Sequence, residues 1–319
     1  MTDGICLSIV IPIYNAGAYL RQCMESLLAS DGIEDTQIIL VDDGSSDDSG
    51  AIAEEYASGH SNITVFHKEN GGPSAARNLG LREASGRYVF FCDSDDEVVP
   101  ELFSEVINMT QKSDVDVIMW DSDLLYETRS YLVNNNRGFF AHDGLEKKER
   151  IYTGKEFVRT LLENSGDFVA AVWLGAYRRD YLVDSGLLFE EGLIHEDELW
   201  VPKVMFNAAT VYYYPVKLYH YRVHKGSIMN PGSRDRKKHV DSLMKIYPSL
   251  YEYYDENIED EHLRRLIEGN LTKKYLHMIY KFNIVKYGYG KQIDKKLLWR
   301  TSLRLIEKMM VMLLYVYAH

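Results

Sequence analysis

Leu7-Ser8-Ile9-Val10-Ile11-Pro12-Ile13 is a short, almost entirely apolar stretch, and runs of this length and composition predict a buried β-strand. Similar runs recur at residues 37–41, 63–66, 88–92 and 115–120, and helical patterns fill the segments between them. Strands that alternate with helices in this way are typical of βαβ units. We therefore predict an α/β fold with a mainly parallel sheet whose two faces are covered by helices.

The turns after the predicted strands are the places to look for a ligand, because open parallel sheets bind ligands beyond the carboxyl ends of their strands. The second strand leads into Asp42 and Asp43, which are followed by Gly44 and Ser45. These carboxylates can accept hydrogen bonds from the N–H or hydroxyl groups of a ligand. Asp, Gly and Ser are also common in turns for purely local reasons, so both interpretations stay open.

The fourth strand leads into a denser acidic cluster, Asp93-Ser94-Asp95-Asp96. Two carboxylates about 5 Å apart repel each other by roughly 3 kcal/mol at an effective dielectric constant of about 20. A divalent cation offsets this repulsion, and Mg²⁺ or Mn²⁺ is usually held by one or two carboxylates together with substrate phosphates. We interpret the cluster as a metal and diphosphate site; an exposed, solvated acidic turn is the alternative.

Arg77 lies in a glycine-containing segment between the third strand and the next helix. Gly71 and Gly72 allow close approach of the backbone, and Pro73 suits the first turn of a helix. From that turn Arg77 would project toward the same edge of the sheet, where it can contact a base or a phosphate. A salt bridge to a neighbouring acid is the alternative interpretation.

A second acidic group, Glu196-Asp197-Glu198, starts the helix predicted at residues 196–207. Acidic side chains are favoured at the start of a helix by the helix dipole, whatever their function. A transfer reaction, however, needs a general base, and this group lies far in sequence from the first cluster. We therefore keep both interpretations for it.

The segment after the strands expected at residues 210–223 contributes three further candidates. Arg222, His224 and Ser227 can contact a phosphate or a metal. A single histidine after a strand is more often structural, so a structural role for His224 stays open.

Two other segments are less regular. Residues 121–150 are polar and rich in Asn, which predicts an exposed loop or hairpin over the site. Thr153 and Glu156 then form a capping box that starts a helix extending to about residue 164.

Taken in order, these motifs resemble glycosyltransferase family 2. The matching stretches are residues 8–15, 41–45, 71–78, 93–95 and 196–197. Each motif is weak on its own, whereas the ordered set is specific. The resemblance implies a GT-A fold, a nucleotide-diphospho-sugar donor, usually with uridine, and inversion at the anomeric carbon by a single displacement.

The resemblance also implies roles for individual residues. Asp197 would be the base that deprotonates the acceptor hydroxyl, and Glu196 would help to place the acceptor. Asp95 would bind Mn²⁺ or Mg²⁺, and His224 is a weaker candidate ligand that matches no position of the family. The residues implied to bind the nucleotide-sugar donor are Pro12, Tyr14, Asn15, Asp42, Asp43, Arg77, Asp93, Ser94, Arg222 and Ser227. Residues 173–182 resemble the family's stretch before the base and are expected to line the acceptor pocket.

The C-terminal part differs in charge from the rest. The net charge is −12, but residues 264–319 carry 12 basic and three acidic side chains, so this part is about +9 and the remainder about −21. We predict a catalytic domain at residues 1–230 and a helical, basic region at residues 231–319. Its basic and apolar residues suit an anionic membrane surface or a second subunit, with packing inside the chain as the alternative.

Other observations narrow the expected cell compartment and exclude some classes of function. Three cysteines without CxxC spacing favour a reducing compartment, and no run reaches the roughly 18 apolar residues of a membrane span, so we expect a cytoplasmic protein, with peripheral binding to the membrane as an option. Neither GxGxxG nor GxxxxGK[ST] is present, which disfavours a dehydrogenase and a P-loop enzyme. The acidic catalytic part disfavours nucleic acid as a partner.

The expected reaction transfers a hexose or N-acetylhexosamine from a UDP-sugar to a free or lipid-linked saccharide, as in the synthesis of capsular or exopolysaccharide. Two alternatives remain, a sugar nucleotidyltransferase and a glycan- or nucleotide-binding protein that has lost catalysis. The first would be expected to carry a Gly-rich loop with Arg or Lys directly after the first strand, where this chain has Pro12 to Asn15.

Overall fold

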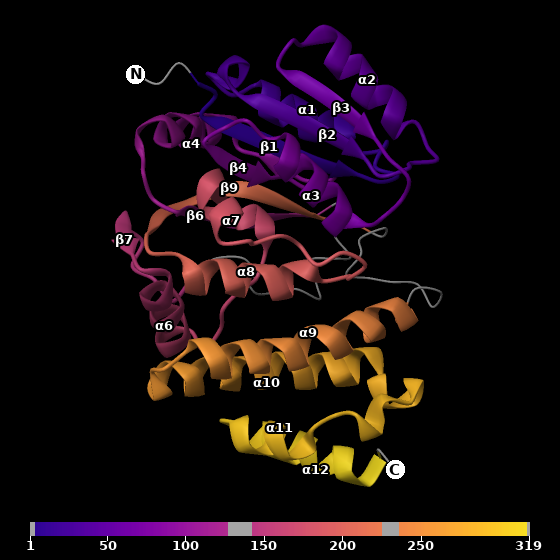
Figure 1. Ribbon diagram of the computed structural model, residues 1–319, viewed down its shortest axis with the longest axis vertical. Helices are drawn as coiled ribbons and strands as arrows, with labels where there is room; N and C mark the ends of the chain where they lie inside the picture. The colour runs from indigo at the N-terminus through magenta and orange to yellow at the C-terminus, as the bar shows by residue number, and fades with distance from the viewer. Residues whose placement is uncertain (1–3, 127–141, 225–235, 318–319) are drawn as a thin grey trace.

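The computed structural model describes residues 4–126, 142–224 and 236–317, and it has one large mixed sheet with helices around it (Figure 1). Its strands lie in the order β3-β2-β1-β4-β8-β6-β9-β5, and β7 pairs with β9. The first four predicted strands are present as β1 (Leu7–Ile13), β2 (Gln37–Asp42), β3 (Ile63–His67) and β4 (Tyr88–Phe91). They pair in parallel, as the alternating pattern predicted.

The second half of the sheet was harder to predict. β8 (Gly175–Arg178) is antiparallel to β4 and to β6 (Val117–Tyr126), between which it lies. Its sequence, Gly-Ala-Tyr-Arg, lacks the apolar run on which the other strands were recognised, so it was missed. The long β9 (Val211–Val223) runs parallel to β6, and the two short strands β5 (Glu97–Val98) and β7 (Arg150–Tyr152) pair with it in antiparallel fashion.

The prediction of a loop from residue 121 onward was wrong for its first part, because β6 continues to Tyr126. β9 supplies the reason, since it pairs with this half of β6 up to the Tyr126–Val223 pair. A polar segment can therefore form a strand when a long neighbour provides its backbone partners. Residues 127–141 of the predicted loop lie outside the described residues.

Helices of the first half connect the strands and pack on the sheet. They are α1 (Leu20–Leu28), α2 (Ser49–Gly59), α3 (Pro73–Glu83) and α4 (Pro100–Lys112), with a short 3₁₀ turn, η1 (Ile33–Asp35), before β2. α3 lies very close to β1, because a Cβ atom on Gly80 would stand only 2.2 Å from Val10 Cγ1. This contact fixes how closely α3 packs on the sheet, and it thereby fixes the position of Arg77 on that helix.

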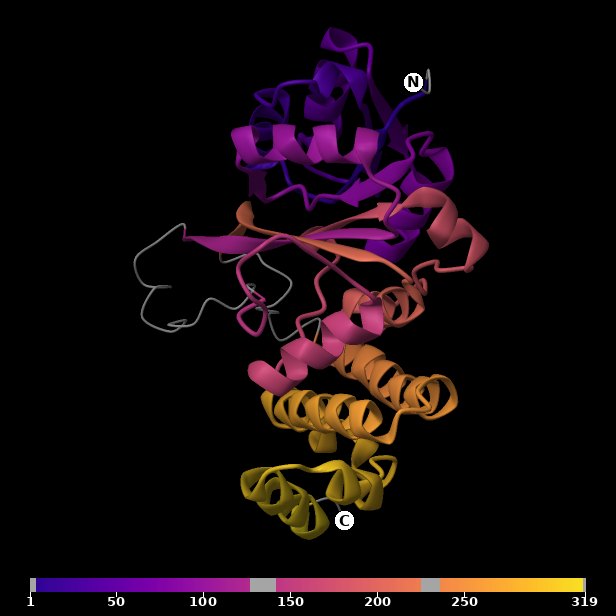
Figure 2. The ribbon, with the colours of Figure 1, turned by 90° about the vertical axis from the view of Figure 1, so that its left-hand side faces the viewer.

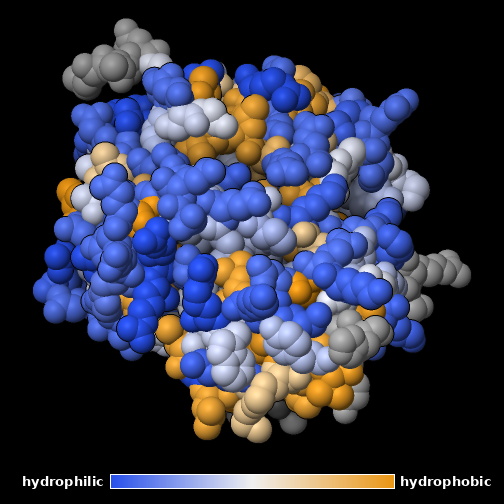
Figure 3. All heavy atoms as spheres, turned by 60° about the horizontal axis from the view of Figure 1, so that its bottom comes forward, coloured by the Kyte–Doolittle hydropathy of each residue, from blue (hydrophilic) through white to orange (hydrophobic). Residues whose placement is uncertain are grey.

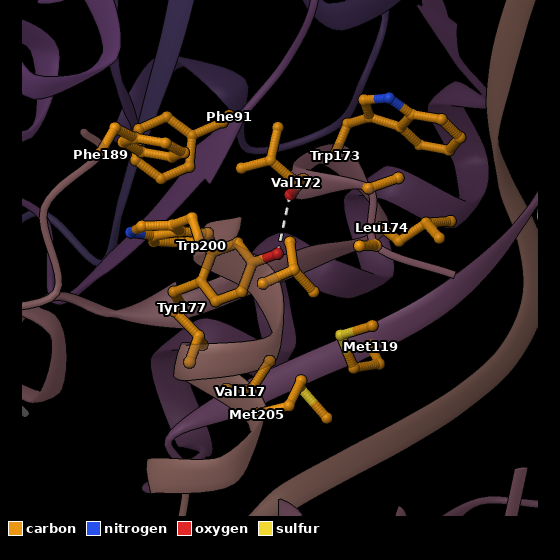
Figure 4. Close-up of a cluster of buried hydrophobic side chains, with 14 of the residues drawn as sticks. Phe91, Val117, Met119, Val172, Trp173, Leu174, Tyr177, Phe189, Trp200 and Met205 are labelled. Atoms are coloured by element: carbon orange, nitrogen blue, oxygen red, sulfur yellow. Dashed lines mark hydrogen bonds between the residues drawn. The ribbon is translucent and has the colours of Figure 1, made fainter. Parts of the chain in front are cut away.

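The middle of the chain contributes the 3₁₀ turn η2 (Val172–Leu174) and the helices α6 (Gly154–Asn164), α7 (Arg179–Asp184) and α8 (Glu196–Asn207). The predicted capping box is confirmed, since Glu156 N donates to Thr153 Oγ1 at 3.2 Å and Thr153 N donates to Glu156 Oε2 at 2.9 Å. Between these helices and the sheet lies an aromatic cluster, in which Phe189 stacks on Trp200 with ring centroids 4.4 Å apart (Figure 4).

The C-terminal region is helical throughout its described part, as predicted. The long helices α9 (Arg236–Asn257) and α10 (Glu261–Phe282) pack together, and α8 and α6 lie against them (Figure 2). The 3₁₀ turns η3 (Ile284–Tyr287) and η4 (Tyr289–Lys291) lead to α11 (Lys295–Thr301) and α12 (Leu305–Tyr317) at the far end. The domain boundary predicted at residue 230 falls between described ranges and stays a prediction.

Candidate active site

The turn after β1 is bound to the turn after β2. Asn15 adopts a left-handed conformation, with φ of 51°. Its backbone N–H donates to Ser45 Oγ at 3.0 Å, and its Oδ1 accepts from Ser46 N at 2.8 Å. The neighbouring Tyr14 is 56% exposed, so its ring is free to stack on a flat ligand such as a base. Pro12, two residues earlier, is partly buried in β1.

Asp43 joins this surface to the segment after β3. Its Oδ1 accepts from Lys68 Nζ at 2.6 Å and from Gly71 N at 2.9 Å, and its Oδ2 accepts from Gly72 N at 2.7 Å. The carboxylate is almost fully buried. Asp43 thus joins the turn after β2 to the loop after β3, at the carboxyl ends of the strands, where a nucleotide is expected to bind.

The Asp42 side chain contacts other residues of the protein. Its Oδ1 accepts from Ser45 N at 2.9 Å, and its Oδ2 lies 2.9 Å from His67 Nδ1. Burial opposes the charge, but the hydrogen bonds from Ser45 and His67 outweigh it and lower the pKa of Asp42 below its ordinary value. Asp42 therefore has the local role in the turn that was one of the two interpretations from the sequence; its contact with a ligand stays a prediction.

Arg77 connects the two acidic groups. Its side chain is 6% exposed; one guanidinium nitrogen donates to Asp93 Oδ1 at 2.7 Å, and another forms an ion pair with Glu196. The guanidinium also lies over the ring of Phe189, 5.6 Å from its centroid. The ion-pair alternative therefore describes Arg77 in the structure, and its contact with the base stays a prediction.

The two candidate metal ligands lie side by side. His224 Nε2 is 2.9 Å from Asp95 Oδ2, although the residues are 129 positions apart in the chain. The Asp95 side chain is 33% exposed, whereas that of His224 is 8% exposed. In the ranges that the structure describes, no group of three His, Cys, Asp or Glu side chains is arranged to hold a metal ion.

This arrangement nevertheless fits a metal that is held jointly with a substrate. Mg²⁺ and Mn²⁺ are bound in many phosphoryl sites by one or two carboxylates, with the remaining ligands supplied by water and phosphate oxygens. Asp95 offers an oxygen donor that is open to solvent on one side, and His224 a nitrogen donor beside it. The residues present therefore suit such an ion.

Asp96, by contrast, faces the interior. It is 1% exposed, its Oδ1 accepts from Arg222 N at 2.7 Å, and its Oδ2 accepts from the Tyr219 hydroxyl at 2.7 Å. Burial, together with the charges of Asp95 and Asp93, raises the pKa of Asp96 well above its ordinary value. Asp96 thus attaches β9 to the acidic cluster and is not exposed to a ligand.

Arg222 is also engaged within the protein. Its Nε donates to the backbone oxygen of Asp95 at 2.8 Å, and its guanidinium forms an ion pair with Glu97. Its guanidinium lies 5.3 Å from the ring centroid of Tyr19. A contact with the diphosphate stays a prediction for Arg222 and for Ser227, which lies outside the described residues. Ser94 is buried within the acidic cluster.

Asp197 is the predicted base. It lies in the first turn of α8 and is partly exposed, and its Oδ1 accepts from Glu198 N at 2.9 Å. Burial, followed by the negative charges of Glu196 and Glu198, raises the pKa of Asp197 well above its ordinary value. A raised pKa makes the deprotonated carboxylate a stronger base.

One contributor to the site was missed in the sequence. The Tyr219 hydroxyl accepts from Asp93 N at 3.1 Å and donates to Asp96, so it binds two residues of the acidic cluster at once. Trp173 stacks on its ring, with centroids 4.5 Å apart. Tyr219 is one of several tyrosines in β9, and the sequence pattern does not distinguish it from the others.

Comparison with known proteins places the chain in a family. The family model described as glycosyl transferase family 2 matches residues 8–184. The chain is 33% identical over 257 residues to the uncharacterized glycosyltransferase YibD of Escherichia coli K12, an alignment that covers 79% of this chain and 73% of that protein. The chain therefore belongs to glycosyl transferase family 2. The matched range ends before Glu196 and Asp197.

Solved structures agree on the fold. The structure of S. aureus TarS 1–349 in complex with UDP-GlcNAc matches with a TM-score of 0.65 at 21% identity, covering 97% of this chain and 79% of that one. The mannosyltransferase PcManGT from Pyrobaculum calidifontis, in complex with GDP-Man and Mn²⁺, matches with a TM-score of 0.55 at 14% identity, covering 99% and 88%. The predicted GT-A architecture with additional C-terminal helices is confirmed.

Proposed function

We propose that this glycosyltransferase moves a hexose or N-acetylhexosamine from a UDP-sugar to a hydroxyl of a saccharide acceptor, with inversion at the anomeric carbon. The observation that carries the proposal is the bridge from Asp93 through Arg77 to Glu196. It places the acidic cluster after β4 beside the acidic start of α8, so a donor site and a base can serve one reaction. This proximity is what a single displacement requires.

In the proposed mechanism Asp197 accepts the proton of the acceptor hydroxyl while that oxygen attacks C1 of the donor sugar. The C1–O bond to the nucleoside diphosphate breaks, and the diphosphate leaves with its electron pair. General base catalysis of this kind contributes on the order of 10²- to 10⁴-fold. Glu196 is held by Arg77 and would orient the acceptor beside Asp197.

The donor site would be divided along the edge of the sheet. Tyr14 and the loops joined by Asp43 would hold the nucleoside, and Asp93 would face the ribose and diphosphate. Asp95, with His224 beside it, would hold Mn²⁺ or Mg²⁺. When bound, the ion would neutralise the charge that develops on the leaving diphosphate. The complex of the structural neighbour TarS with UDP-GlcNAc supports uridine as the nucleoside.

The acceptor is proposed to be a saccharide of a cell-surface polymer, carried on a lipid at the cytoplasmic face of the membrane. None of the helices in the described ranges is long and apolar enough to cross a membrane. An anionic membrane surface would instead meet the C-terminal helices, whose outermost helix, α12, exposes apolar side chains. They are Leu305, Ile306, Met309, Met312, Leu313, Tyr315 and Val316.

The charge of this region favours a membrane over a second copy of the chain. Figure 3 shows apolar side chains gathered along one edge of this end of the molecule. Lys295, Lys296, Arg300, Arg304 and Lys308 lie on or beside α11 and α12, whereas Glu307 is buried. Two copies docked by this face would bring their basic residues together, while anionic lipids would attract them.

A screen of nucleotide sugars by thermal shift, with and without Mn²⁺, tests the proposal. We expect stabilisation by one UDP-sugar that is larger with the metal, followed by slow release of UDP in the absence of acceptor. Binding without any release of UDP, also with saccharide acceptors present, would favour a binding protein without transfer activity. Formation of a nucleotide sugar from UTP and a sugar phosphate would instead favour a nucleotidyltransferase.

A further inference from the structure

The backbone turn immediately before Glu196 and Asp197 is unusual. His195 has φ of 67° and ψ of 35°, a left-handed conformation, and it is 7% exposed. Side chains other than glycine adopt this conformation rarely, and such strained residues occur at functional sites where surrounding contacts hold them in place. The contacts that hold His195 therefore bear on the position of the two carboxylates that follow it.

Those contacts come from the C-terminal helical region. His195 Nε2 lies 2.9 Å from His239 Nδ1, and the backbone N–H of Ile194 donates to Ser242 Oγ at 3.0 Å. His239 and Ser242 are three residues apart on α9, so both point from one face of that helix. The ring of His239 in turn stacks on Phe282 of α10, with centroids 5.3 Å apart and planes 15° apart.

The rings of His195 and His239 share a hydrogen bond. Burial, followed by the nearby charges of His239 and Lys281, lowers the pKa of His195 to about 3, so this ring is uncharged at neutral pH. One facing nitrogen must then donate and the other accept, so the proton position on one ring depends on that of the other. Since each of these nitrogens is occupied by the other ring, the pair is not arranged as a metal site.

The turn at His195 is directly connected to the two carboxylates of the site. Glu198 N donates to the backbone oxygen of His195 at 3.1 Å, which closes the first turn of α8 around Asp197. Glu196 lies between them and forms the ion pair with Arg77. A change in the turn at His195 would therefore move Asp197 relative to the donor site and weaken the bridge through Arg77.

We propose that His239 and Ser242 are positioning residues for the transfer reaction, through which α9 holds the left-handed turn at His195 and so sets the place of Asp197. The proposal rests on the proposed role of Asp197 as the base. It makes α9 and α10 part of the catalytic unit, in addition to any contact that α11 and α12 make with a membrane.

Paired substitutions on α9 test this proposal. His239→Leu and Ser242→Ala remove the contacting groups, whereas His239→Asn and Ser242→Thr keep a polar atom near the same place. Because small misplacements of a catalytic group are costly, we expect kcat to fall about 10-fold or more in the first two variants. The conservative variants should recover most of it. The donor Kd, measured by calorimetry, should change less than about twofold, because the donor loops are untouched.

Two controls separate positioning from general destabilisation. Leu250→Ala also creates a defect in the buried face of α9, but eight residues after Ser242 along the helix. If it lowers kcat as much as Ser242→Ala at a similar loss of Tm, the positioning role is overturned. Unchanged kcat in folded Ser242→Ala and His239→Leu would overturn it as well. Asp197→Asn is assayed in parallel, since a normal rate in that variant would count against the proposed function itself.

Discussion

Arg77, whose side chain is 6% exposed, donates to Asp93 Oδ1 at 2.7 Å, so a buried guanidinium meets a carboxylate that is 27% exposed. Its second ion pair, with Glu196, leaves the guanidinium between a carboxylate from each acidic motif. The arrangement gives a structural reason for an arginine at this position, independent of any contact with the donor base.

Replacing Arg77 by Met should destabilise the fold. Removing one partner of a buried ion pair leaves uncompensated charge and costs about 3 kcal/mol or more in the free energy of unfolding. Chemical denaturation measures this difference. The matched control is Arg82→Met on the exposed side of α3, which should change stability by less than about 0.5 kcal/mol. Equal stabilities of the two variants would mean that Arg77 is not a structural bridge.

The order of the motifs in the sequence predicted much of this site, but not its pairings. The apolar runs of β1 to β4 placed the acidic turns at one edge of the sheet, as the structure confirms. These runs could not show that Arg77 contacts Glu196. Glu196 starts α8, and the strand that precedes α8 in the sheet, β8, has four residues without a recognisable strand pattern. Asp95 and Asp96 are likewise alike in the sequence, and the contacts of Asp96 with Tyr219 and Arg222 distinguish the buried one.

The role of Asp197 is tested by Asp197→Asn, which keeps the shape of the side chain but removes the base. Activity should fall at least about 100-fold, while the donor Kd stays nearly unchanged. Steady-state kinetics and calorimetry measure the two quantities. Glu198→Gln is the control at pH values above the acid limb, since Glu198 pairs with Lys274 at 3.3 Å and does not receive the proton in the proposed mechanism, although its charge acts on the pKa of Asp197. A near-normal rate in the Asn variant would remove Asp197 from the mechanism.

The raised pKa of Asp197 predicts a pH dependence with a definite sign. An isolated Asp side chain has a pKa of about 3.9, and burial together with Glu196 and Glu198 raises the pKa of Asp197 above that value. Only the deprotonated form can act as a base, so kcat should fall as the pH decreases through the raised pKa. The acid limb of the profile should therefore lie at a higher pH than about 3.9.

Glu198→Gln gives this pH prediction an internal check. The variant removes one negative charge that raises the pKa of Asp197, so the acid limb of kcat should move to lower pH. Measuring both profiles with the same buffer series decides the matter. A limb that stays in place in the variant would assign the titration to another group.

Metal dependence should reside in Asp95. Asp95→Ala is expected to abolish the difference in donor affinity with and without Mn²⁺, because the oxygen donor nearest to His224 is lost. Calorimetric titration with UDP-sugar under both conditions measures this difference. Asp35→Ala, an exposed acid in η1, should leave it unchanged. If the wild-type protein binds the donor equally with and without Mn²⁺, the metal role of Asp95 is refuted.

Membrane binding should depend on the outward face of α12. Met309 and Met312 are 49% and 50% exposed, whereas Val311 and Leu314 face inward, so Met309→Glu with Met312→Glu adds charge to the exposed face without disturbing packing. We expect the full chain to co-sediment with phosphatidylglycerol-rich vesicles and this double variant to remain largely in the supernatant. Leu188→Glu, at an exposed apolar site far from α12 in sequence, should bind like the unchanged chain.

High salt should weaken this membrane binding, because salt screens the attraction between the basic residues and the anionic lipids. Equal recovery of all three proteins would exclude this face as a membrane contact, and a dimer that only the unchanged and Leu188→Glu chains form would assign the face to a second copy instead.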